Sequence, residues 1–398
     1  MDRKIRIAHI ISRMVSGGAE ENTAYTILGL NKNRYSIDLI VGDDFNRSIL
    51  KHNDKDSEVN IIQVKGLKGP LNIFFDPIIL LKLILIFKKN QYDIVHTHTT
   101  KTGILGRVAA RYVKVPIIIC GLHGSSFRAF NSRILNWSLI YLEKLTGKYT
   151  DAYISVSNLI AERNKREGIG KNSRYYTVLS GMDLKKFYDN KSEFDKKSIT
   201  RELNIDSDAF IIGNVARLEA VKGHTYLIDA FKMVIEKRKG ANILLLIVGE
   251  GEERENLAQY ARRTGLENKI IFTGYRKDIE KIMRIMDMMV LSSLREGLPR
   301  VLVQAAAAGL PSVAFKVDGV PEIVRDGING FLVEPKNVNA LSEKIGRYID
   351  DRNLQKLHGE NGRDIVRGKW SIEEMVDQID TIYQQLIQEK ISNDLLAS

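Results

Sequence analysis

The stretch from Ser292 to Gly309 combines residue types that could hold a phosphorylated ligand. Pro299 suits a first helical position, because its φ is already helical and its missing N–H would have no intrahelical partner there. Gly309 followed by Pro311 is a typical helix stop. The free amides and the positive dipole end at a helix start attract anions, and phosphate is the usual guest. The sequence therefore predicts a loop that leads into an anion-binding helix start.

Side chains that bind hydroxyl groups flank this expected anion seat. Glu296 precedes it, and Gln304 lies five residues beyond Pro299, which is roughly 7 to 8 Å along a helix. Arg300 and Gln304 are four residues apart and share a helix face. A diphosphate bound here would have Glu296 and Gln304 as acceptors for the hydroxyl protons of attached sugars. The competing interpretation is an acidic first turn on an ordinary core helix. The amides of the seat are those of Gly297, Leu298, Arg300 and Val301.

This run resembles the E-x7-E signature of the family 4 glycosyltransferases, which have the GT-B fold, with Glu296 as the first acid. Gln304 stands at the second acid of that pattern, where the family holds the ribose of the nucleotide. Glutamine both accepts hydrogen bonds from hydroxyls and donates to them, so we interpret Gln304 as a tuned ribose contact. The resemblance covers nearly the whole chain and is strongest from Arg217 to Glu334.

Composition limits the class of protein. A chain of 398 residues is long enough for two domains, and 44% hydrophobic with 27% charged residues is typical of a globular protein. The single Cys120 excludes an intramolecular disulfide and suits a reducing compartment. No signal peptide is apparent at the start, so we expect a cytoplasmic protein. The most apolar run, Ile78 to Phe87, is interrupted by Lys82 and predicts a core or interfacial helix.

The positive charge is concentrated in the first half. The net charge is +11, with 32 Lys+Arg against 19 Asp+Glu in residues 1–200 and 28 against 30 beyond them. Such asymmetry predicts an anionic partner, and no nucleic-acid module is present. Residues 101–150 hold eight Lys+Arg and one acid, Glu143. Aromatic and basic side chains suit a lipid headgroup layer, so we hypothesise docking on an anionic membrane surface. The residues concerned are Phe127, Arg128, Phe130, Arg133, Trp137, Tyr141, Lys144 and Lys148.

Short apolar runs alternate with helical patterns in both halves, which predicts mostly parallel sheets covered on both faces. The expected strands are Lys4–Ile10, Ser36–Val41, Val59–Val64, Asp93–His96, Pro116–Leu122, Ala152–Val156, Tyr175–Leu179, Ile211–Val215, Ile243–Val248, Ile270–Thr273, Met288–Leu291 and Ser312–Phe315. We predict a first domain at 1–185, a polar linker at 186–208 and a second domain at 209–371. The family resemblance implies that the helix at 372–398 packs back on the first domain.

Gly17 and Gly18 lie between the first expected strand and a helical pattern. Strand, glycine turn and helix start is an arrangement that binds phosphate, although a tight turn needs the same residues. The motif is not G-x-G-x-x-G, so a dinucleotide-dependent dehydrogenase is disfavoured. In the family that the chain resembles, this loop faces donor and acceptor across the cleft.

Three histidines lie at the ends of two expected strands. His96 and His98 are two residues apart and would face the same way, as metal ligands do, but no third ligand is visible nearby, which favours hydrogen-bonded structural histidines. His123 follows the next strand. Its surroundings, Val95–Ala109 and Gly121–Ser125, resemble the family, in which the matching histidine contacts the donor sugar near the reacting carbon. The alternative is a histidine that caps a strand end.

Cations and a glycine follow two strands of the second half. Arg217 and Lys222 lie between a strand and a helix, where arginine can bind a diphosphate bidentately and lysine acts as a point charge. Their spacing resembles that of the family's phosphate-binding residues. Gly274, Tyr275 and Arg276 follow another strand, and in the family the backbone there contacts the nucleobase.

We therefore predict a GT-B enzyme with two Rossmann-like α/β/α domains facing across a cleft. The resemblance implies retaining transfer of a hexose or N-acetylhexosamine from a UDP-linked donor to a saccharide or polyprenyl-diphosphate-linked acceptor in polysaccharide biosynthesis. It also implies catalysis without a metal or other cofactor, by His123, Glu296, Arg217 and Lys222. Two alternatives stay open: another GT-B enzyme, such as a phosphorylase or epimerase, and a non-catalytic nucleotide-binding subunit, which Gln304 alone supports.

Overall fold

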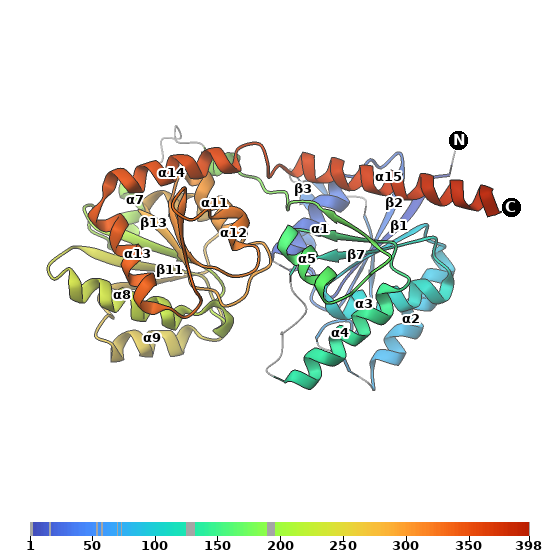
Figure 1. The fold of residues 1–398 in the computed structure, drawn as a ribbon, viewed down its shortest axis with the longest axis horizontal. Helices are drawn as coiled ribbons and strands as arrows, with labels where there is room; N and C mark the ends of the chain where they lie inside the picture. The colour runs from blue at the N-terminus through green and yellow to red at the C-terminus, as the bar shows by residue number, and fades with distance from the viewer. Residues whose placement is uncertain are drawn as a thin grey trace. The chain divides into compact units, whose positions relative to one another are not determined.

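The computed structural model describes residues 3–15, 17–52, 55–56, 59–69, 71–72, 74–124, 132–188 and 196–397. The chain divides into two compact units, Met1–Met182 with Trp370–Ser398 and Asp183–Lys369. Each unit contains a parallel sheet with helices on both faces, so the predicted two-domain α/β class is confirmed (Figure 1).

The first unit is built on a seven-stranded sheet in the order β5-β2-β1-β6-β7-β8-β9. Its strands are β1 (Ile5–Ile11), β2 (Tyr35–Val41), β5 (Asn60–Gln63), β6 (Ile94–His98), β7 (Ile117–Leu122), β8 (Ala152–Ser155) and β9 (Arg174–Thr177), with a small separate pair, β3 (Lys51–His52) and β4 (Lys55–Asp56). Its helices are α1 (Gly18–Gly29), η1 (Arg47–Leu50), α2 (Asp76–Asn90), α3 (Thr100–Val113), α4 (Arg133–Gly147), α5 (Asn158–Arg166) and α15 (Ile372–Ala397).

Strand β1 explains how this sheet is covered on both faces. Alternate side chains of a strand point to opposite faces. Ile7 and Ile11 pack into a cluster that includes residues of α1 and α15, while Ala8 and Ile10 join a cluster formed with α2 and α3. Both faces are therefore buried, which is why the strand reads as a nearly continuous apolar run.

The second unit has a six-stranded sheet in the order β12-β11-β10-β13-β14-β15. Its strands are β10 (Phe210–Val215), β11 (Ile243–Val248), β12 (Ile270–Gly274), β13 (Met288–Leu291), β14 (Ser312–Phe315) and β15 (Gly330–Val333). Its helices are α6 (Lys185–Tyr188), α7 (Lys196–Glu202), η2 (Ala220–Lys222), α8 (His224–Lys237), α9 (Arg254–Arg263), α10 (Ile279–Ile285), α11 (Arg300–Ala308), α12 (Val320–Ile323), α13 (Val338–Asp350) and α14 (Arg352–Val366).

The structure differs from the sequence expectations in four places. The stretch 186–208 contains α7, which packs against α10 within the second unit and buries Ile199 and Ile205. A helix of seven residues is too short to show a clear apolar period. Strand β15 was not expected after the turns at 326–330. Helix α11 begins at Arg300, so Pro299 precedes the helix instead of opening it. His96 and His98 lie within β6 and do not follow it.

Candidate functional site

The predicted donor-binding residues of the second unit lie at the carboxyl ends of its strands. Arg217 follows β10, Tyr275 follows β12, and Glu296 lies in the loop between β13 and α11. The carboxyl ends of parallel strands meet at one edge of the sheet, which is where ligands bind in open α/β sheets. These loops are far apart in the sequence but lie along the same edge of the sheet.

Lys222 and Glu296 form the central contact of this edge. The Lys222 Nζ atom lies 2.7 Å from Glu296 Oε1, and the two side chains are only 17% and 10% exposed. The backbone N–H of Glu296 donates to Asp318 Oδ2 at 2.8 Å. The Ser292 hydroxyl donates to the Lys222 carbonyl at 3.1 Å. A cation and a carboxylate are thus held together by three different loops.

Gly223 makes the close approach of these loops feasible. Its φ is 63°, in the left-handed region that favours glycine, and a Cβ there would collide with the Ser292 carbonyl oxygen. The residue between Lys222 and α8 therefore has to be glycine.

The predicted anion seat lies directly beside this pair. The Gly319 N–H donates to the Gly297 carbonyl at 3.1 Å, and the Leu302 N–H donates to the Pro299 carbonyl at 2.9 Å. These bonds fix the loop before α11. Leu298 is buried, whereas Arg300, Val301 and Gln304 are half-buried on the first turns of the helix.

Two predicted cations differ in how firmly the protein holds them. Arg217 is 56% exposed and pairs with Glu219 at 2.7 Å, and exposed pairs of this kind are weak. Arg276 is bound by Asp278 at 2.8 Å and by Glu202, contacts that raise the pKa of its guanidinium. Arg276 is thus paired with two carboxylates of the protein, Glu202 and Asp278. Gly274 and Tyr275, which is 61% exposed, directly precede it in the chain.

Three buried residues at this edge were not found from the sequence. The side-chain atoms Asn214 Oδ1, His224 Nε2 and Ser293 Oγ are buried and have no hydrogen-bond partner among the described residues. Burial, followed by the charge of Lys222, lowers the pKa of His224 to about 4. His224 could have been predicted as a site residue from the sequence, because it directly follows Lys222-Gly223 at the start of a helix.

The glycine turn of the first unit is present but contains its own anion. Helix α1 begins at Gly18, and the carboxylate of the buried Glu20 lies over Gly17. Glu20 Oε1 accepts from Arg13 Nε at 2.9 Å. The glycine turn therefore has a carboxylate of the protein beside it, and the absence of a side chain at Gly17 leaves room for that carboxylate.

The histidines form a larger cluster than the sequence indicated. His96 and His98 share one face of β6, with ring centroids 4.3 Å apart. His98 Nδ1 lies 2.8 Å from His123 Nε2, and burial lowers the pKa of His123 to about 4. The expectation that no third group lies near His96 and His98 was wrong. Strand β1 pairs with β6 and places His9 opposite His96, so that nitrogens of His9, His96 and His98 lie within 4.8 Å of one another.

Comparison with known proteins agrees with this fold. Residues 16–186 match the Glycosyltransferase Family 4 model, and residues 195–365 match the model for Glycosyl transferases group 1. The chain is 28% identical over 388 residues to an Escherichia coli UDP-Gal:alpha-D-GlcNAc-diphosphoundecaprenol alpha-1,3-galactosyltransferase, covering 97% of this chain and 98% of that one. It is 29% identical over 343 residues to the Staphylococcus aureus capsular polysaccharide biosynthesis glycosyltransferase CapM, covering 84% and 88% of the two chains.

The fold of this chain is also similar to that of a solved structure. The Anabaena protein HepE in complex with UDP and glucose superposes with a TM-score of 0.80 at 21% identity, over 96% of this chain and 100% of that one. The architecture is the GT-B fold. The two family models together cover most of the chain, and this protein is therefore a glycosyltransferase of family 4.

Proposed function

We propose that this enzyme transfers a hexose or N-acetylhexosamine from a UDP-sugar to a saccharide carried on polyprenyl diphosphate, with retention at the anomeric carbon. The observation that carries the proposal is the Lys222–Glu296 pair beside the start of α11, which places a cation and a hydroxyl acceptor next to the first turn of a helix. The name of the E. coli relative, which includes both a UDP-linked donor and a diphosphoundecaprenol acceptor, supports the choice of substrates.

In this proposal the diphosphate is the leaving group. Lys222, Arg217 and the amides near Pro299 stabilise the negative charge that develops on it, so that no metal ion is needed. Glu296 accepts hydrogen bonds from sugar hydroxyls, Gln304 binds the ribose, and His123 contacts the sugar. The bond from the anomeric carbon to the diphosphate oxygen breaks, a bond to the acceptor hydroxyl oxygen forms, and the hydroxyl proton passes to the departing diphosphate.

The test is a panel of UDP-hexoses and UDP-N-acetylhexosamines, each with and without a polyprenyl-diphosphate-linked acceptor, in buffer with a chelator. We expect UDP release only when acceptor is present, and NMR of the product should show an unchanged anomeric configuration. Consumption of donor with phosphate would indicate a phosphorylase, and conversion without acceptor an epimerase. UDP binding without turnover on any donor would indicate a non-catalytic subunit.

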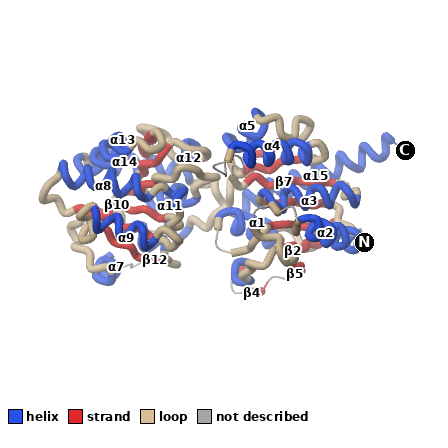
Figure 2. The backbone as a smooth tube through the Cα atoms, turned by 90° about the horizontal axis from the view of Figure 1, so that it is seen from below, coloured by secondary structure: helices blue, strands red, loops and turns tan. Residues whose placement is uncertain are grey.

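We further propose that helices α2 and α4 dock the first unit on an anionic membrane. Both helices neighbour α3 in the layer on one side of the sheet (Figure 2). One face of α2, with Ile79, Leu83 and Phe87, is buried, whereas other large apolar side chains of α2, of the residues before it and of α4 are exposed. Those side chains are Phe74, Phe75, Ile78, Leu81 and Leu85 near α2 and Ile134, Leu135, Trp137 and Tyr141 on α4, each at least half exposed.

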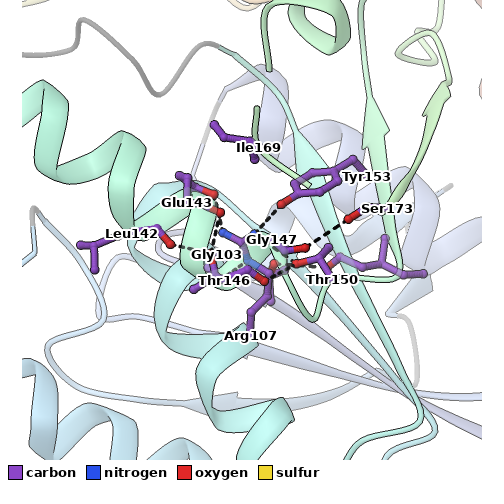
Figure 3. Close-up of polar contacts among 12 residues, drawn as sticks. Gly103, Arg107, Leu142, Glu143, Thr146, Gly147, Thr150, Tyr153, Ile169 and Ser173 are labelled. Atoms are coloured by element: carbon purple, nitrogen blue, oxygen red, sulfur yellow. Dashed lines mark hydrogen bonds and ion pairs between the residues drawn. The ribbon is translucent and has the colours of Figure 1, made fainter. Parts of the chain in front are cut away.

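The charges on these two helices favour an anionic surface. Each helix has a single acidic residue, and both acids are buried. Asp76 of α2 pairs with Lys101 at 2.8 Å, and Glu143 of α4 pairs with Arg107 at 2.5 Å (Figure 3). The exposed charges of the helices are therefore all positive, namely Lys82, Lys88, Lys89, Arg133 and Lys144, and the exposed Lys148 follows α4 directly. Phe127, Arg128 and Phe130, which the sequence analysis also assigned to this surface, lie outside the described residues.

Cosedimentation with vesicles tests the docking surface. Each cation near an anionic leaflet contributes about 1 kcal/mol, so binding to anionic vesicles should exceed binding to neutral ones and should weaken at 1 M salt. Trp137→Ser with Tyr141→Ser should lower the bound fraction. Leu357→Ser, at an exposed leucine on α14 of the second unit, is the matched control and should leave it unchanged. Equal binding to both vesicle types, or no effect of salt, would exclude this surface.

A further inference from the structure

Four of the histidines in the first unit are connected, together with one tyrosine, in a continuous chain of side-chain contacts. His9 is fully buried, and His96 and His98 are 2% exposed, while His123 is half-buried. His9 pairs with His96 across β1 and β6, and His98 pairs with Gly121 across β6 and β7. A Cβ on Gly121 would lie 2.8 Å from His98 Nδ1, 3.1 Å from His123 Nε2 and 3.2 Å from His96 Nε2. The missing side chain at Gly121 therefore makes room for three imidazoles.

The contacts run from His123 through His98 and His9 to a tyrosine, and from that tyrosine to His96. His123 Nε2 lies 2.8 Å from His98 Nδ1, and His98 Nε2 lies 3.1 Å from His9 Nδ1. His9 Nε2 is 3.4 Å from the hydroxyl oxygen of Tyr383, which is 2.6 Å from His96 Nδ1. Tyr383 belongs to α15 and is fully buried in the same unit.

Each neutral imidazole carries one donor nitrogen and one acceptor nitrogen, which makes the chain directional. Burial lowers the pKa values of all four histidines and raises that of Tyr383, so the chain is neutral near pH 7. His98 uses both of its nitrogens, so it must donate to one neighbour and accept from the other. Two arrangements satisfy every contact and also give the hydroxyl proton of Tyr383 an acceptor; a third, in which the Tyr383 oxygen accepts from both His9 and His96, leaves that buried proton without an acceptor among these contacts. In one of the two, His123 donates from Nε2 and has a bare Nδ1; in the other, His123 accepts at Nε2 and carries its proton on Nδ1.

The free end at His96 decides between them. His96 Nε2 is buried and has no partner in the described part of the chain. If Tyr383 donated to His96, that nitrogen would carry a buried N–H without an acceptor. If His96 donates to Tyr383, the nitrogen is only a bare lone pair, and orphaned buried N–H groups are the rarer of the two. The second direction is therefore favoured. Tyr383 then donates to His9, His9 to His98, and His98 to His123.

We propose that Tyr383 is a positioning residue that fixes His123 in the tautomer with its proton on Nδ1, so that His123 meets the donor sugar as a hydrogen-bond donor. This role of Tyr383 rests on the proposed function, in which His123 contacts the donor sugar. Under this proposal the hydroxyl of Tyr383 on α15 determines which nitrogen of His123, the residue directly after β7, carries the proton, although Tyr383 does not touch the substrate.

NMR of the full-length protein with 15N-labelled histidine reads the tautomers directly and without substrate. We expect wild-type His123 as a single Nδ1–H tautomer. Tyr383→Phe keeps the ring in the core and removes the hydroxyl, and it should convert His123 into a mixture of tautomers. With the best donor and acceptor, kcat should fall about tenfold and KM should change less than twofold.

Tyr35→Phe is the matched control. Tyr35 is also a buried tyrosine whose hydroxyl bonds α15, through Asp380, but it lies outside the histidine chain. In the Tyr35→Phe variant, His123 should keep the tautomer that it has in the wild type. A His123 tautomer unchanged by Tyr383→Phe, or an Nε2–H tautomer in the wild type, would overturn the proposal.

A metal assay covers the remaining arrangement of these side chains. The purified chain should contain no stoichiometric transition metal; a metal lost in His98→Gln would show that His9, His96 and His98 are ligands, and it would overturn the hydrogen-bonded chain. The two proposals fail separately. An enzyme inactive on every UDP-sugar, with the expected tautomers, would refute the function and leave the positioning role of Tyr383 intact.

Discussion

A single ion pair places opposite charges where a nucleotide-sugar would need them. Lys222 and Glu296 are mostly buried, and each is oriented by backbone contacts from a different loop. Preorganised charge of this kind stabilises a developing negative charge without reorganisation during the reaction. The pair also limits Glu296 to one free carboxylate oxygen for a sugar hydroxyl.

Removing the cation should therefore impair the chemical step. Lys222→Met should raise the activation free energy obtained from kcat/KM by on the order of 2 to 4 kcal/mol, as loss of an oxyanion-stabilising donor does. Arg217→Ala should change it in the same direction. Lys232→Met, at a half-exposed lysine of α8 paired with Glu236, is the control and should retain activity. Steady-state kinetics decide the matter: a loss below threefold in both site variants contradicts the assignment.

Gln304 should tolerate a carboxylate. It is half-buried on α11 in the position where the family pattern has an acid, and a carboxylate also accepts hydrogen bonds from ribose hydroxyls. Gln304→Glu should therefore bind UDP and remain active, whereas Gln304→Ala should bind UDP more weakly. Titration calorimetry measures both affinities. Complete loss of UDP binding in a folded Gln304→Glu protein would show that the residue does not hold the ribose in this way.

At this scale the sequence revealed residue types but not their partners. Glu296, Lys222 and the helix start were found from local chemistry. Their mutual contact, the role of Asp318 and the arrival of His9 beside His96 depend on strands far apart in the chain. A glycine motif also does not show which side chains lie beside it, as the carboxylate of Glu20 next to Gly17 illustrates.

Among the elements, α3 and α4 are joined by a buried polar network around Arg107 (Figure 3). Arg107 is fully buried and donates to Glu143 at 2.5 Å, to the Tyr153 hydroxyl at 3.0 Å and to the Gly103 carbonyl at 2.6 Å. A buried charge without its partner is costly, whereas an apolar pair in the same space costs much less. Removing one of the two charges should therefore destabilise the packing of α4 more than replacing both of them.

Glu143→Leu should lower the free energy of unfolding by about 3 to 5 kcal/mol, because it leaves the Arg107 charge buried and unpaired. The double variant Arg107→Met with Glu143→Leu should be more stable than Glu143→Leu alone. Urea unfolding followed by circular dichroism measures both. If the double variant is no more stable than the single one, the cost does not come from an unpaired charge.

Elements with strong apolar patterns were predicted closely, and weakly patterned ones were not. The expected bounds of β11, β13 and β14 agree with the structure because these strands are continuous apolar runs. Helix α7 was missed because Ile199 is its one apolar residue. Strand β15 was missed although three of its four residues are apolar, because it is short and follows directly on the turns at 326–330. The exposed face of α2 could not be told from its buried face, because both are apolar.

In the whole molecule, the buried histidines make stability depend on pH. An imidazole whose pKa is lower in the folded state than its ordinary 6.5 binds its proton more readily in the unfolded chain. Stability is therefore fully present above about pH 6.5 and is lost as the pH falls toward the folded-state pKa, which is about 4 for His123 and His224.

Each such histidine should contribute up to about 1.4 kcal/mol per pH unit to this loss between those limits. The free energy of unfolding from urea titrations at several pH values should fall on acidification, and His123→Gln should reduce the slope. A slope identical in His123→Gln and wild type would contradict the burial of a neutral His123. Within the described residues no helix is long and apolar enough to span a membrane.

Helix α15 has a consequence for how the protein is made. It supplies Met375, Val376, Ile379, Ile382, Tyr383 and Leu386 to a core that otherwise consists of residues up to Val178. On the ribosome, the first unit emerges first but lacks this helix until the whole second unit has been synthesised. At about 5 to 20 residues per second, residues 183–369 occupy on the order of ten to forty seconds. During that time the α15-binding face of the nascent first unit is an apolar surface exposed to chaperones, whereas the second unit has every residue that it needs to fold as soon as its own synthesis ends.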